Sequence, residues 1–419
     1  MKNMNDMKNM KKYDLIVIGG GITGVAAAVS AAREGLSTLL VEKFGSLGGA
    51  MSNSLVYPFM NHSVKAGEGR RLTSAGIFSE MKQRRAKFND VSWETYKFVF
   101  DDMTTEAGVD VLFHSTVFEA VCDGREIKSV KIATKSGVLE FEADFFIDAS
   151  GDGELIAMTG CDFQLGRESD GFCQPMTTCF RVAGVDVDKF LLEKPELQIK
   201  YNEYQAQGRM INPRENILVF VGPGDGILHF NTTRIVKHDP TDPFDVSRAE
   251  ITARKQINEM LEFLKENSSA FEHASLVYVA NHIGVRESRK LKGVHVLTVD
   301  ELKSCVKFDD RIALGNYDID IHNPLGTGTY IYRFEPGEYY SIPYRSLLPK
   351  EYDNMLVAGR CLSADHGAHS SVRIMPICAC LGEAAGTAVA VAKQTSANAH
   401  TVDVTAVQNK LRENKAVID

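Results

Sequence analysis

Apolar residues in the first fifty positions come in short runs separated by glycines and by a stretch rich in alanine. Residues 13–18 (YDLIVI) end in four consecutive aliphatic side chains, which predicts a buried strand. The alanines of residues 26–32 then favour a helix that Gly35 ends, and residues 39–41 (LLV) predict a second strand. This order of strand, helix and strand is typical of an α/β domain built on a parallel sheet.

Glycine occupies the turn between the first strand and the helix. Gly19, Gly21 and Gly24 form G-x-G-x-x-G, with Ile22 and Thr23 inside the motif. Such a turn lets the backbone approach a pyrophosphate, while the helix N-terminus offers free N–H groups to the anion. Glycines also cluster in ordinary turns, so the motif alone is weak evidence. Its position between a strand and a helix favours dinucleotide binding over a plain turn.

An acidic residue closes the second predicted strand. Glu42 lies eighteen residues after Gly24, where an acid holds a ribose hydroxyl in dinucleotide-binding units. An acid here favours NAD or FAD over NADP, because a 2′-phosphate would be repelled. The neighbouring residues Lys43, Gly48 and Gly49 are expected near the same ligand. A third glycine turn, Ser150, Gly151 and Asp152, is a second candidate contact for a phosphate or for adenosine.

The middle of the chain predicts further elements. Two amphipathic helices are expected at 71–85 and 92–107, with Ile77 and Met81 in the first inner face and Phe98, Val99 and Met103 in the second. Four strands are expected at 117–121, 127–134, 138–141 and 145–147, of which the first three form an antiparallel meander.

The pattern of apolar and polar residues changes after about residue 160, and this change predicts the domain organisation. Helical patterns at 188–192, 196–208 and 247–266 alternate with strand-like runs, without a second G-x-G-x-x-G. We therefore expect an inserted, mixed α+β cap domain over residues 161–335. A buried strand at 354–358 and a helix at 376–392, with Gly382 and Gly386 on one face, return to the first pattern. The nucleotide-binding domain is thus expected in two parts, 13–160 and 336–419, after a disordered tail at 1–12.

Composition narrows the functional classes. The 419 residues hold 47 Lys and Arg against 55 Asp and Glu, and a net charge of −8 disfavours general nucleic-acid binding. The eight cysteines include no C-x-x-C, so neither a redox dithiol nor a zinc knuckle is indicated, and no metal site is expected. Residues 1–12 are polar and basic without an apolar core, so we expect no secretion signal and a cytoplasmic protein. No apolar stretch reaches the roughly 18 residues of a membrane span.

Four segments resemble a known family. They are VIGGGITG with Glu42, FIDASGDGELIAMTG, GVRESRKLKG at 284–293, and the long block from IPYRSLLP to LGEAAG. Together they are similar to the FAD-dependent oxidoreductases of the glutathione-reductase-like flavoprotein class. The resemblance implies a Rossmann-like FAD/NAD(P)-binding fold and FAD as cofactor. It places the pyrophosphate at the first glycines, the adenosine ribose at Glu42, and the ribityl chain at Gly359 and Arg360. The helix after Ser370 and Ser371 would then point its N-terminus at the flavin ring.

The chain also departs from that class. Gly-Asp is common where this chain has Gly359-Arg360, and both the redox C-x-x-C and the separate NAD(P)H domain of disulfide reductases are missing. The electron donor or acceptor is therefore unidentified. The step His366-Gly367-Ala368 is similar to one in fumarate reductase and succinate dehydrogenase flavoproteins, where it borders the substrate, which suggests a dicarboxylate.

Five residues are candidates for catalysis. His366 and His369 titrate in the useful range and lie beside the inferred ring, so either could move a proton. Arg286, Arg289 and Arg373 could hold a carboxylate or stack on the flavin. The competing interpretations are buried structural histidines and arginines in interdomain salt bridges.

The sequence therefore predicts an FAD-dependent oxidoreductase that transfers a hydride between bound flavin and a small organic substrate. Two alternatives stay open. A flavin-dependent RNA-modifying enzyme would need a basic surface, against which the net charge argues. A non-catalytic flavin-binding protein would hold FAD without turnover. Substrate, reaction direction, covalent attachment of FAD and a homo-oligomeric state are left open.

Overall fold

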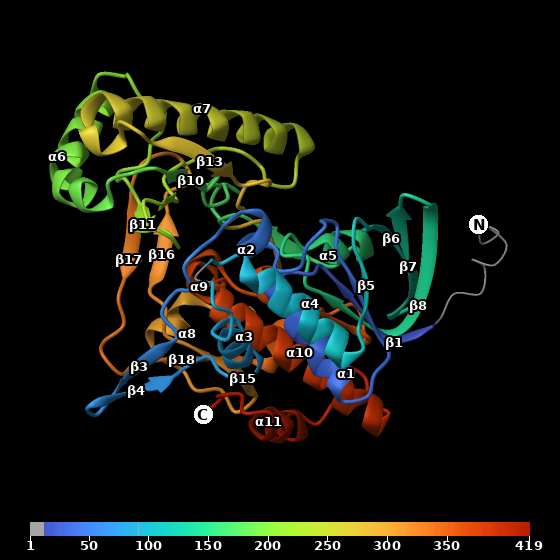
Figure 1. Cartoon of the computed structure of the whole chain (residues 1–419). Coiled ribbons are helices and arrows are strands. Elements are labelled where there is room, and N and C mark those ends of the chain that lie inside the picture. Colours follow the sequence, from blue (N-terminus) through green and yellow to red (C-terminus); the bar gives the residue numbers. More distant parts are fainter. Residues whose placement is uncertain (1–11, 91) are drawn as a thin grey trace.

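The computed structural model describes residues 12–90 and 92–419, so most of the tail expected at 1–12 lies outside the described residues (Figure 1). A seven-stranded sheet organises the chain, in the order β5-β2-β1-β8-β7-β6, with β19 also paired to β8. Its strands are β1 (Tyr13–Ile18), β2 (Thr38–Val41), β5 (Asp110–Leu112), β6 (Thr116–Asp123), β7 (Glu126–Thr134), β8 (Gly137–Asp148) and β19 (Met355–Val357). β5, β2, β1, β8 and β19 run parallel, whereas β6, β7 and β8 form the antiparallel meander. The α/β, Rossmann-like fold class is confirmed.

Alternation along β1 explains how the sheet is covered on both faces. Leu15 and Val17 point into a core shared with the helices, while Ile16 and Ile18 point into a second core shared with the meander. Both faces are apolar because a parallel strand is buried on each side. The helices on the first face are α1 (Ile22–Arg33), α3 (Ile77–Arg85), α4 (Thr95–Ala107) and α10 (Met375–Thr395) (Figure 1).

Small residues let α10 lie directly against α1. A Cβ atom added at Gly382 would come within 2.1 Å of the Thr23 carbonyl oxygen, and one at Gly386 within 2.2 Å of the Ala27 carbonyl oxygen. The two backbones therefore meet with no side chain between them. By length and composition α10 could cross a membrane, but 94% of its most apolar window is buried inside the protein. Its apolar surface is thus taken up by the protein's own core.

The region expected as the cap folds around its own core (Figure 1). An antiparallel sheet in the order β11-β12-β10-β13 packs on two long helices. These elements are β10 (Phe180–Ala183), α6 (Val187–Ala206), β11 (Val219–Val221), β12 (Leu228–Phe230), α7 (Pro243–Asn267), η2 (Ser269–Phe271) and β13 (Ser275–Val279). The hairpin of β16 (Ile319–His322) and β17 (Thr329–Tyr332) rises beside this unit (Figure 1).

Shorter elements connect these parts. They are α2 (Ala50–Asn53), β3 (Ser63–Ala66), β4 (Gly69–Leu72), α5 (Glu154–Thr159), β9 (Phe163–Leu165), β14 (Arg289–Leu291), α8 (Val299–Lys303), β15 (Arg311–Gly315), β18 (Tyr340–Pro343), η3 (Tyr344–Leu347), η4 (Gly359–Cys361), α9 (His366–Val372) and α11 (Val404–Glu413). The strand β14 pairs with β9, so a segment late in the expected cap returns to its beginning.

Several expected boundaries were wrong. The strands expected at 138–141 and 145–147 form the single strand β8, which pairs with β7 in its first half and with β1 in its second. The helix expected at 71–85 begins only at Ile77, because residues 69–72 pair in the hairpin β3-β4. Phe98, expected in an inner face, is 56% exposed. The helices expected at 188–192 and 196–208 are one helix, α6, which continues through Pro195.

The contact between α1 and α10 can be tested at Gly386. We expect Gly386→Ala to lower the free energy of unfolding by about 1–3 kcal/mol, because the new methyl group must displace the backbone of α1. Urea denaturation measures this change. Gly326→Ala is the matched control, since a Cβ atom there meets nothing within 4 Å. Equal stability of both variants would show that the two helices are not in tight contact.

A second test concerns the buried carboxyl of Glu383 on α10, which is 1% exposed. Its Oε2 accepts a hydrogen bond from the Ile77 N–H (3.0 Å), and burial raises its pKa from 4.5 to about 8. Between these values the folded state keeps a proton that the unfolded state releases, so stability falls as the pH rises.

We expect Glu383→Gln to remove this fall, which amounts to at most about 1.4 kcal/mol per pH unit. Unfolding free energies of both proteins at pH 5 and pH 8 provide the measurement. The exposed Glu142→Gln serves as control and is expected to keep the slope of the parent. If the unfolding free energies of the parent and of Glu383→Gln changed by the same amount between pH 5 and pH 8, the raised pKa of Glu383 would be contradicted.

Candidate cofactor and substrate site

A cavity of about 510 Å³ opens at the carboxyl ends of the parallel strands β1, β2 and β8. This edge of a parallel sheet is where ligands bind in α/β folds. The cavity is lined by the first glycine turn, by the end of β2, by the turn after β8 and by residues of the cap region. It therefore joins segments that are far apart in the sequence.

Two positions of the first glycine turn, Gly19 and Gly24, have room only for glycine. Gly19 has φ +97°, and a Cβ atom there would come within 2.6 Å of the Ala149 carbonyl oxygen. A Cβ atom at Gly49 would come within 2.8 Å of the Gly21 Cα, so the two glycine turns touch. Gly24 lies under the turn, where a Cβ atom would come within 1.8 Å of the Gly19 carbonyl oxygen. No side chain caps the N-terminus of α1, so its N–H groups are open to an anion.

Glu42 closes the next side of the cavity and is 4% exposed. Its Oε2 accepts a hydrogen bond from the Gly20 N–H (2.7 Å), and its Oε1 accepts one from the Phe44 N–H (2.8 Å). Burial raises the pKa of this carboxyl, although both hydrogen bonds oppose the shift. Lys43 pairs with Glu154 at 2.8 Å on the same wall. The carboxylate of Glu42 is thus fixed, and because each oxygen accepts one hydrogen bond, each keeps a further lone pair.

The turn after β8 is held by a carboxylate at each end. Asp148 is fully buried and accepts hydrogen bonds from the Ser150 N–H (3.0 Å) and hydroxyl (2.6 Å). Asp152 accepts from Arg360 Nη2 (2.7 Å) and from the Ser288 hydroxyl (2.9 Å). Burial alone would raise the pKa of Asp152, but the charges of Arg360 and Lys43 and the hydrogen bonds from Arg360 and Ser288 together outweigh it and lower the pKa. Arg360 therefore crosses the middle of the cavity with its charge already paired.

The two candidate histidines lie beneath the cavity and do not line it. His366 Nδ1 is 2.9 Å from Glu287 Oε1, and Glu287 also pairs with the fully buried Lys290. His369 donates from Nε2 to the Arg360 carbonyl oxygen (2.9 Å), and burial lowers its pKa far below the usual range. His369 thus supports the backbone of Arg360, while His366 belongs to a buried ion-pair network.

The remaining predicted site residues divide by position. Those that line the cavity are Gly19, Gly21, Ile22, Thr23, Glu42, Lys43, Gly48, Gly49, Ser150, Gly151, Asp152, Arg286, Arg360 and Arg373. Those that do not are Gly24, Arg289, Gly359, His366, His369, Ser370 and Ser371. Ser370 and Ser371 instead fasten α9 to the segment before and within β16, through the Asp320 N–H and the Tyr317 carbonyl oxygen.

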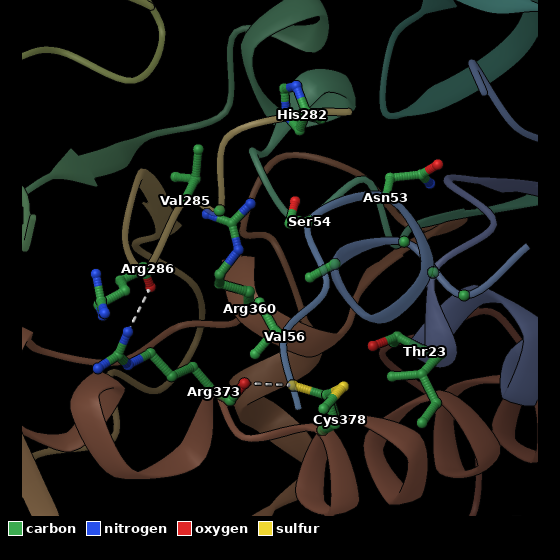
Figure 2. A pocket seen from close by; sticks show the side chains of 18 of the residues that line it. Thr23, Asn53, Ser54, Val56, His282, Val285, Arg286, Arg360, Arg373 and Cys378 are labelled. Carbon is green, nitrogen blue, oxygen red and sulfur yellow. Dashed lines mark hydrogen bonds between the residues drawn. The ribbon is translucent and has the colours of Figure 1, made fainter. Parts of the chain in front are cut away.

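Beyond Arg360 the same cavity continues to Arg286 and Arg373 (Figure 2), and we call this part of it the cap-side chamber. Six ionisable residues define it: Arg214, Arg286, Tyr317, Asp320, His322 and Arg373. Figure 2 shows Arg286 and Arg373 close together on one side of the cavity, with Arg360 between them and Thr23 of the glycine turn. The first residues of α10, Met375 and Cys378, also line the cavity.

A chain of hydrogen bonds starts at Tyr317 in this chamber. The Tyr317 hydroxyl donates to Asp320 Oδ2 (3.1 Å), and His322 Nε2 lies 3.5 Å from the same oxygen. Arg234 Nη2 donates to His322 Nδ1 (3.0 Å), and because a guanidinium only donates, the ring proton of neutral His322 lies on Nε2 toward Asp320. Burial lowers the pKa of His322 to about 3. Although burial opposes it, His322 and Arg373 hold the pKa of Asp320 far below its usual range.

Sequence reasoning missed four members of the chamber: Arg214, Tyr317, Asp320 and His322. A signal for two of them was available, because Asp318, Asp320 and His322 alternate with isoleucines along β16. Such a period of two places polar side chains on one face of a strand. Arg214 stands in a loop without any motif, so its arrival in the chamber depends on how the cap folds.

Comparisons with known proteins agree with this geometry. A family model described as FAD dependent oxidoreductase matches residues 14–411. Digeranylgeranylglycerophospholipid reductase 2 of Methanothermobacter thermautotrophicus is 30% identical over 201 residues, which cover 43% of this chain and 50% of that protein. Glutathione reductase of Debaryomyces hansenii is 29% identical over 199 residues, covering 40% of this chain and 39% of that protein. The chain thus spans half or less of the length of these two relatives.

Solved structures are similar at lower sequence identity. A geranylgeranyl bacteriochlorophyll reductase-like protein from Thermoplasma acidophilum aligns with a TM-score of 0.48 and 13% identity, over 97% of this chain and 84% of that one. The flavin-dependent brominase Bmp2 aligns with a TM-score of 0.46 and 14% identity, over 96% and 83%.

The residues present also fit FAD on structural grounds. Gly19, Gly21 and Gly49, which we call the glycine cradle, lie at the uncapped N-terminus of α1 and leave space that side chains would occupy. The buried carboxylate of Glu42 lies at the end of β2. These are the features that hold the pyrophosphate and the ribose of a dinucleotide. With the family match over nearly its whole length, the chain belongs to the FAD-dependent oxidoreductase family, an enzyme family whose cofactor is FAD.

Proposed function

We propose that this enzyme transfers a hydride between bound FAD and a small organic substrate held in the cap-side chamber. The observation that carries the proposal is that one cavity joins the glycine cradle to a chamber lined by ionisable side chains. FAD supplies the hydride chemistry when bound, so the chain must bind the substrate and handle a proton. The finer likeness to glutathione-reductase-like flavoproteins is supported by the βαβ unit with its glycine turn.

The proposal assigns cofactor contacts to the nucleotide end of the cavity. Gly19, Gly21 and the N-terminus of α1 would hold the pyrophosphate, and Glu42 the adenosine ribose. Arg360 would lie along the middle of the cofactor. The N-terminus of α10 lines the far part of the cavity, where its N–H groups would favour negative charge on a reduced flavin.

A proton would be held at the Tyr317 hydroxyl. From there the contacts continue through Asp320 to His322, whose Nδ1 accepts from Arg234 and lies 3.1 Å from the Thr329 hydroxyl oxygen. Thr329 donates to Glu215 Oε1 (2.8 Å), whose side chain is 33% exposed. The hydrogen bonds of Tyr317 therefore extend as far as Asp320 and His322, and polar contacts lead on to a partly exposed carboxylate. This arrangement supports Tyr317 as the group that exchanges a proton with the substrate, in place of the histidines expected from sequence.

A dicarboxylate substrate was suggested by the step His366-Gly367-Ala368. The two histidines lie beneath the cavity, so this step gives the idea no direct support. The positive side chains of Arg214, Arg286 and Arg373 in the chamber nevertheless favour an anionic substrate. The proposed substrate is therefore an anion.

The cofactor assignment can be tested at Glu42. We expect Glu42→Gln to raise the dissociation constant for FAD roughly tenfold, since a charge-assisted hydrogen bond contributes about 1.5–3 kcal/mol and the amide keeps part of it. Titrating the cofactor-free protein with FAD and following flavin fluorescence gives the constant. The exposed Glu142→Gln is the control, with unchanged affinity expected. An unaltered constant for Glu42→Gln would exclude a ribose contact at this residue.

The reaction class can be tested by anaerobic spectroscopy of the FAD-loaded enzyme. We expect the visible flavin bands to bleach with organic acids, alcohols or amines that donate a hydride, or the photoreduced enzyme to be reoxidised by an organic acceptor. Oxygen, quinone analogues and fumarate would be compared as acceptors. Flavin that no organic donor reduces, and that no organic acceptor reoxidises after photoreduction, would refute the proposal.

The same experiment tests the proton donor. Tyr317→Phe is expected to slow flavin reduction by the active donor about 10²-fold, because general acid-base catalysis contributes that much or more. Tyr330→Phe is the control, since Tyr330 is 53% exposed on β17. Equal rates for both variants would remove Tyr317 from the mechanism.

A further inference from the structure

Three guanidinium groups in the cap-side chamber have no carboxylate partner. Arg214, Arg286 and Arg373 form no ion pair with any residue in the ranges 12–90 and 92–419. Elsewhere in the same region a buried arginine is paired, since Arg234 Nη1 lies 2.9 Å from Glu215 Oε2. A buried charge without a partner is costly, so a chamber that collects three of them implies a missing anion.

The hydrogen bonds of these arginines leave donors unused. Arg214 is 5% exposed and its side chain donates only to Asn216, while its Nη1 is buried without a partner among the described residues. Arg286 donates from Nη1 to the Pro175 carbonyl oxygen (2.6 Å) and to no other described group. Because a guanidinium has five N–H donors in a planar fork, both side chains are positioned by one bond and keep the rest for a ligand.

Arg373 completes the cluster through neutral partners. Its donors reach the Arg286 carbonyl oxygen, the Gln174 amide oxygen and the Asp320 carbonyl oxygen at 3.2 to 3.4 Å. These contacts orient the side chain through neutral oxygens, and the carboxylate of Asp320 acts on its charge only through space, without an ion pair. Burial and the neighbouring Arg214 and Arg373 lower the pKa of Arg286 to about 9, which shows the mutual repulsion. The one carboxylate of the chamber, Asp320, is engaged with Tyr317 and His322.

An apolar surface faces the same cavity. Val56, Pro58 and Met60 follow α2, and Leu218 and Phe220 come from the segment of β11 in the cap region. Each of these five side chains is only half-buried in the protein, so apolar area is exposed toward the cavity. Covering that area with an apolar group contributes about 25 cal/mol per Å². The chamber thus offers a cluster of cations together with an apolar wall.

We propose that the substrate is an organic carboxylate with an apolar body, whose carboxylate binds Arg214, Arg286 and Arg373 while the body covers the apolar wall. This inference rests on the proposed function, because it names the substrate class of the same chamber. The planar fork of arginine matches the two oxygens of a carboxylate. A short dicarboxylate such as succinate has no apolar body with which to cover the apolar side chains of the wall.

The first test compares isosteric ligands on the FAD-loaded enzyme. Hexanoate and benzoate are titrated against hexanamide and benzamide, and succinate is added as the dicarboxylate. Binding is followed by flavin difference absorbance and by calorimetry. We expect both monocarboxylates to bind at least roughly tenfold more tightly than their amides and than succinate, since a charged hydrogen bond contributes about 1.5–3 kcal/mol. Equal binding of acid and amide, or tighter binding of succinate, would overturn the proposal.

Variants then locate the binding site. Arg286→Gln and Arg373→Gln are each expected to weaken hexanoate binding roughly tenfold or more, with Arg286→Lys between them and the parent, because lysine keeps the charge and loses the fork. Arg254→Gln is the matched control, since Arg254 is 55% exposed on α7. Hexanoate affinity that none of the chamber variants changes would also overturn the proposal.

The comparison of acid with amide uses the parent protein, so it holds even if a variant folds poorly. The outcomes also separate the two proposals. Hexanoate binding without flavin reduction or reoxidation by any organic compound would remove hydride transfer and keep the carboxylate site. Reduction by neutral compounds alone, with no carboxylate bound, would keep hydride transfer and remove the carboxylate substrate.

Discussion

The direct contact between the backbones of α1 and α10 determines where both ends of the site lie. Each helix begins at the cavity, α1 beside the glycine cradle and α10 at Met375 near the chamber. Because Gly382 and Gly386 allow no side chain between the helices, their N-termini are held at a fixed separation. Two helix ends that both favour negative charge thus face one elongated cavity. A dinucleotide with a pyrophosphate near one end and a reducible ring near the other matches that arrangement.

Charge is distributed unevenly along the cavity. The nucleotide end contains Glu42, Asp152 and Glu154, each hydrogen-bonded or ion-paired to neighbours. The chamber end contains three arginines that form hydrogen bonds to neutral groups and no ion pair among the described residues. The ion-paired side chains of the nucleotide end stabilise the protein's own structure, while the arginines of the chamber end are available to an anionic ligand. The charged side chains that fix the fold thus lie at the nucleotide end, and those that can bind a ligand lie in the chamber.

The nucleotide end could be predicted from the sequence because its determinants are local. The strand, the glycines and Glu42 fall within thirty residues, and their spacing alone requires a tight turn between a strand and a helix. The chamber could not, because Arg214, Arg286, Tyr317 and Arg373 come from four distant segments that only the folded chain brings together.

The histidines show the limit of motif reasoning. They were expected in a loop before the helix that follows Ser371, whereas the structure places both in the short helix α9, which begins at His366. The direction of the His366 side chain depends on Glu287, which lies 79 residues earlier, and that of His369 on the carbonyl oxygen of Arg360. The expected break within β8 was wrong for a similar reason. A strand that changes partners from the meander to β1 has a mixed pattern, which resembles two short strands.

The side chain of Arg234 has a consequence for how ligands bind. It is 1% exposed and joins the cap region to the β16-β17 hairpin, through the carbonyl oxygens of Gly326 and Gly328 and through His322 and Thr329. Moving the cap core away from this hairpin would break these hydrogen bonds and leave the buried guanidinium without these partners. The cap core and the hairpin are therefore expected to move together. The side of the chamber formed by the hairpin is therefore preformed, and a ligand must match its existing shape.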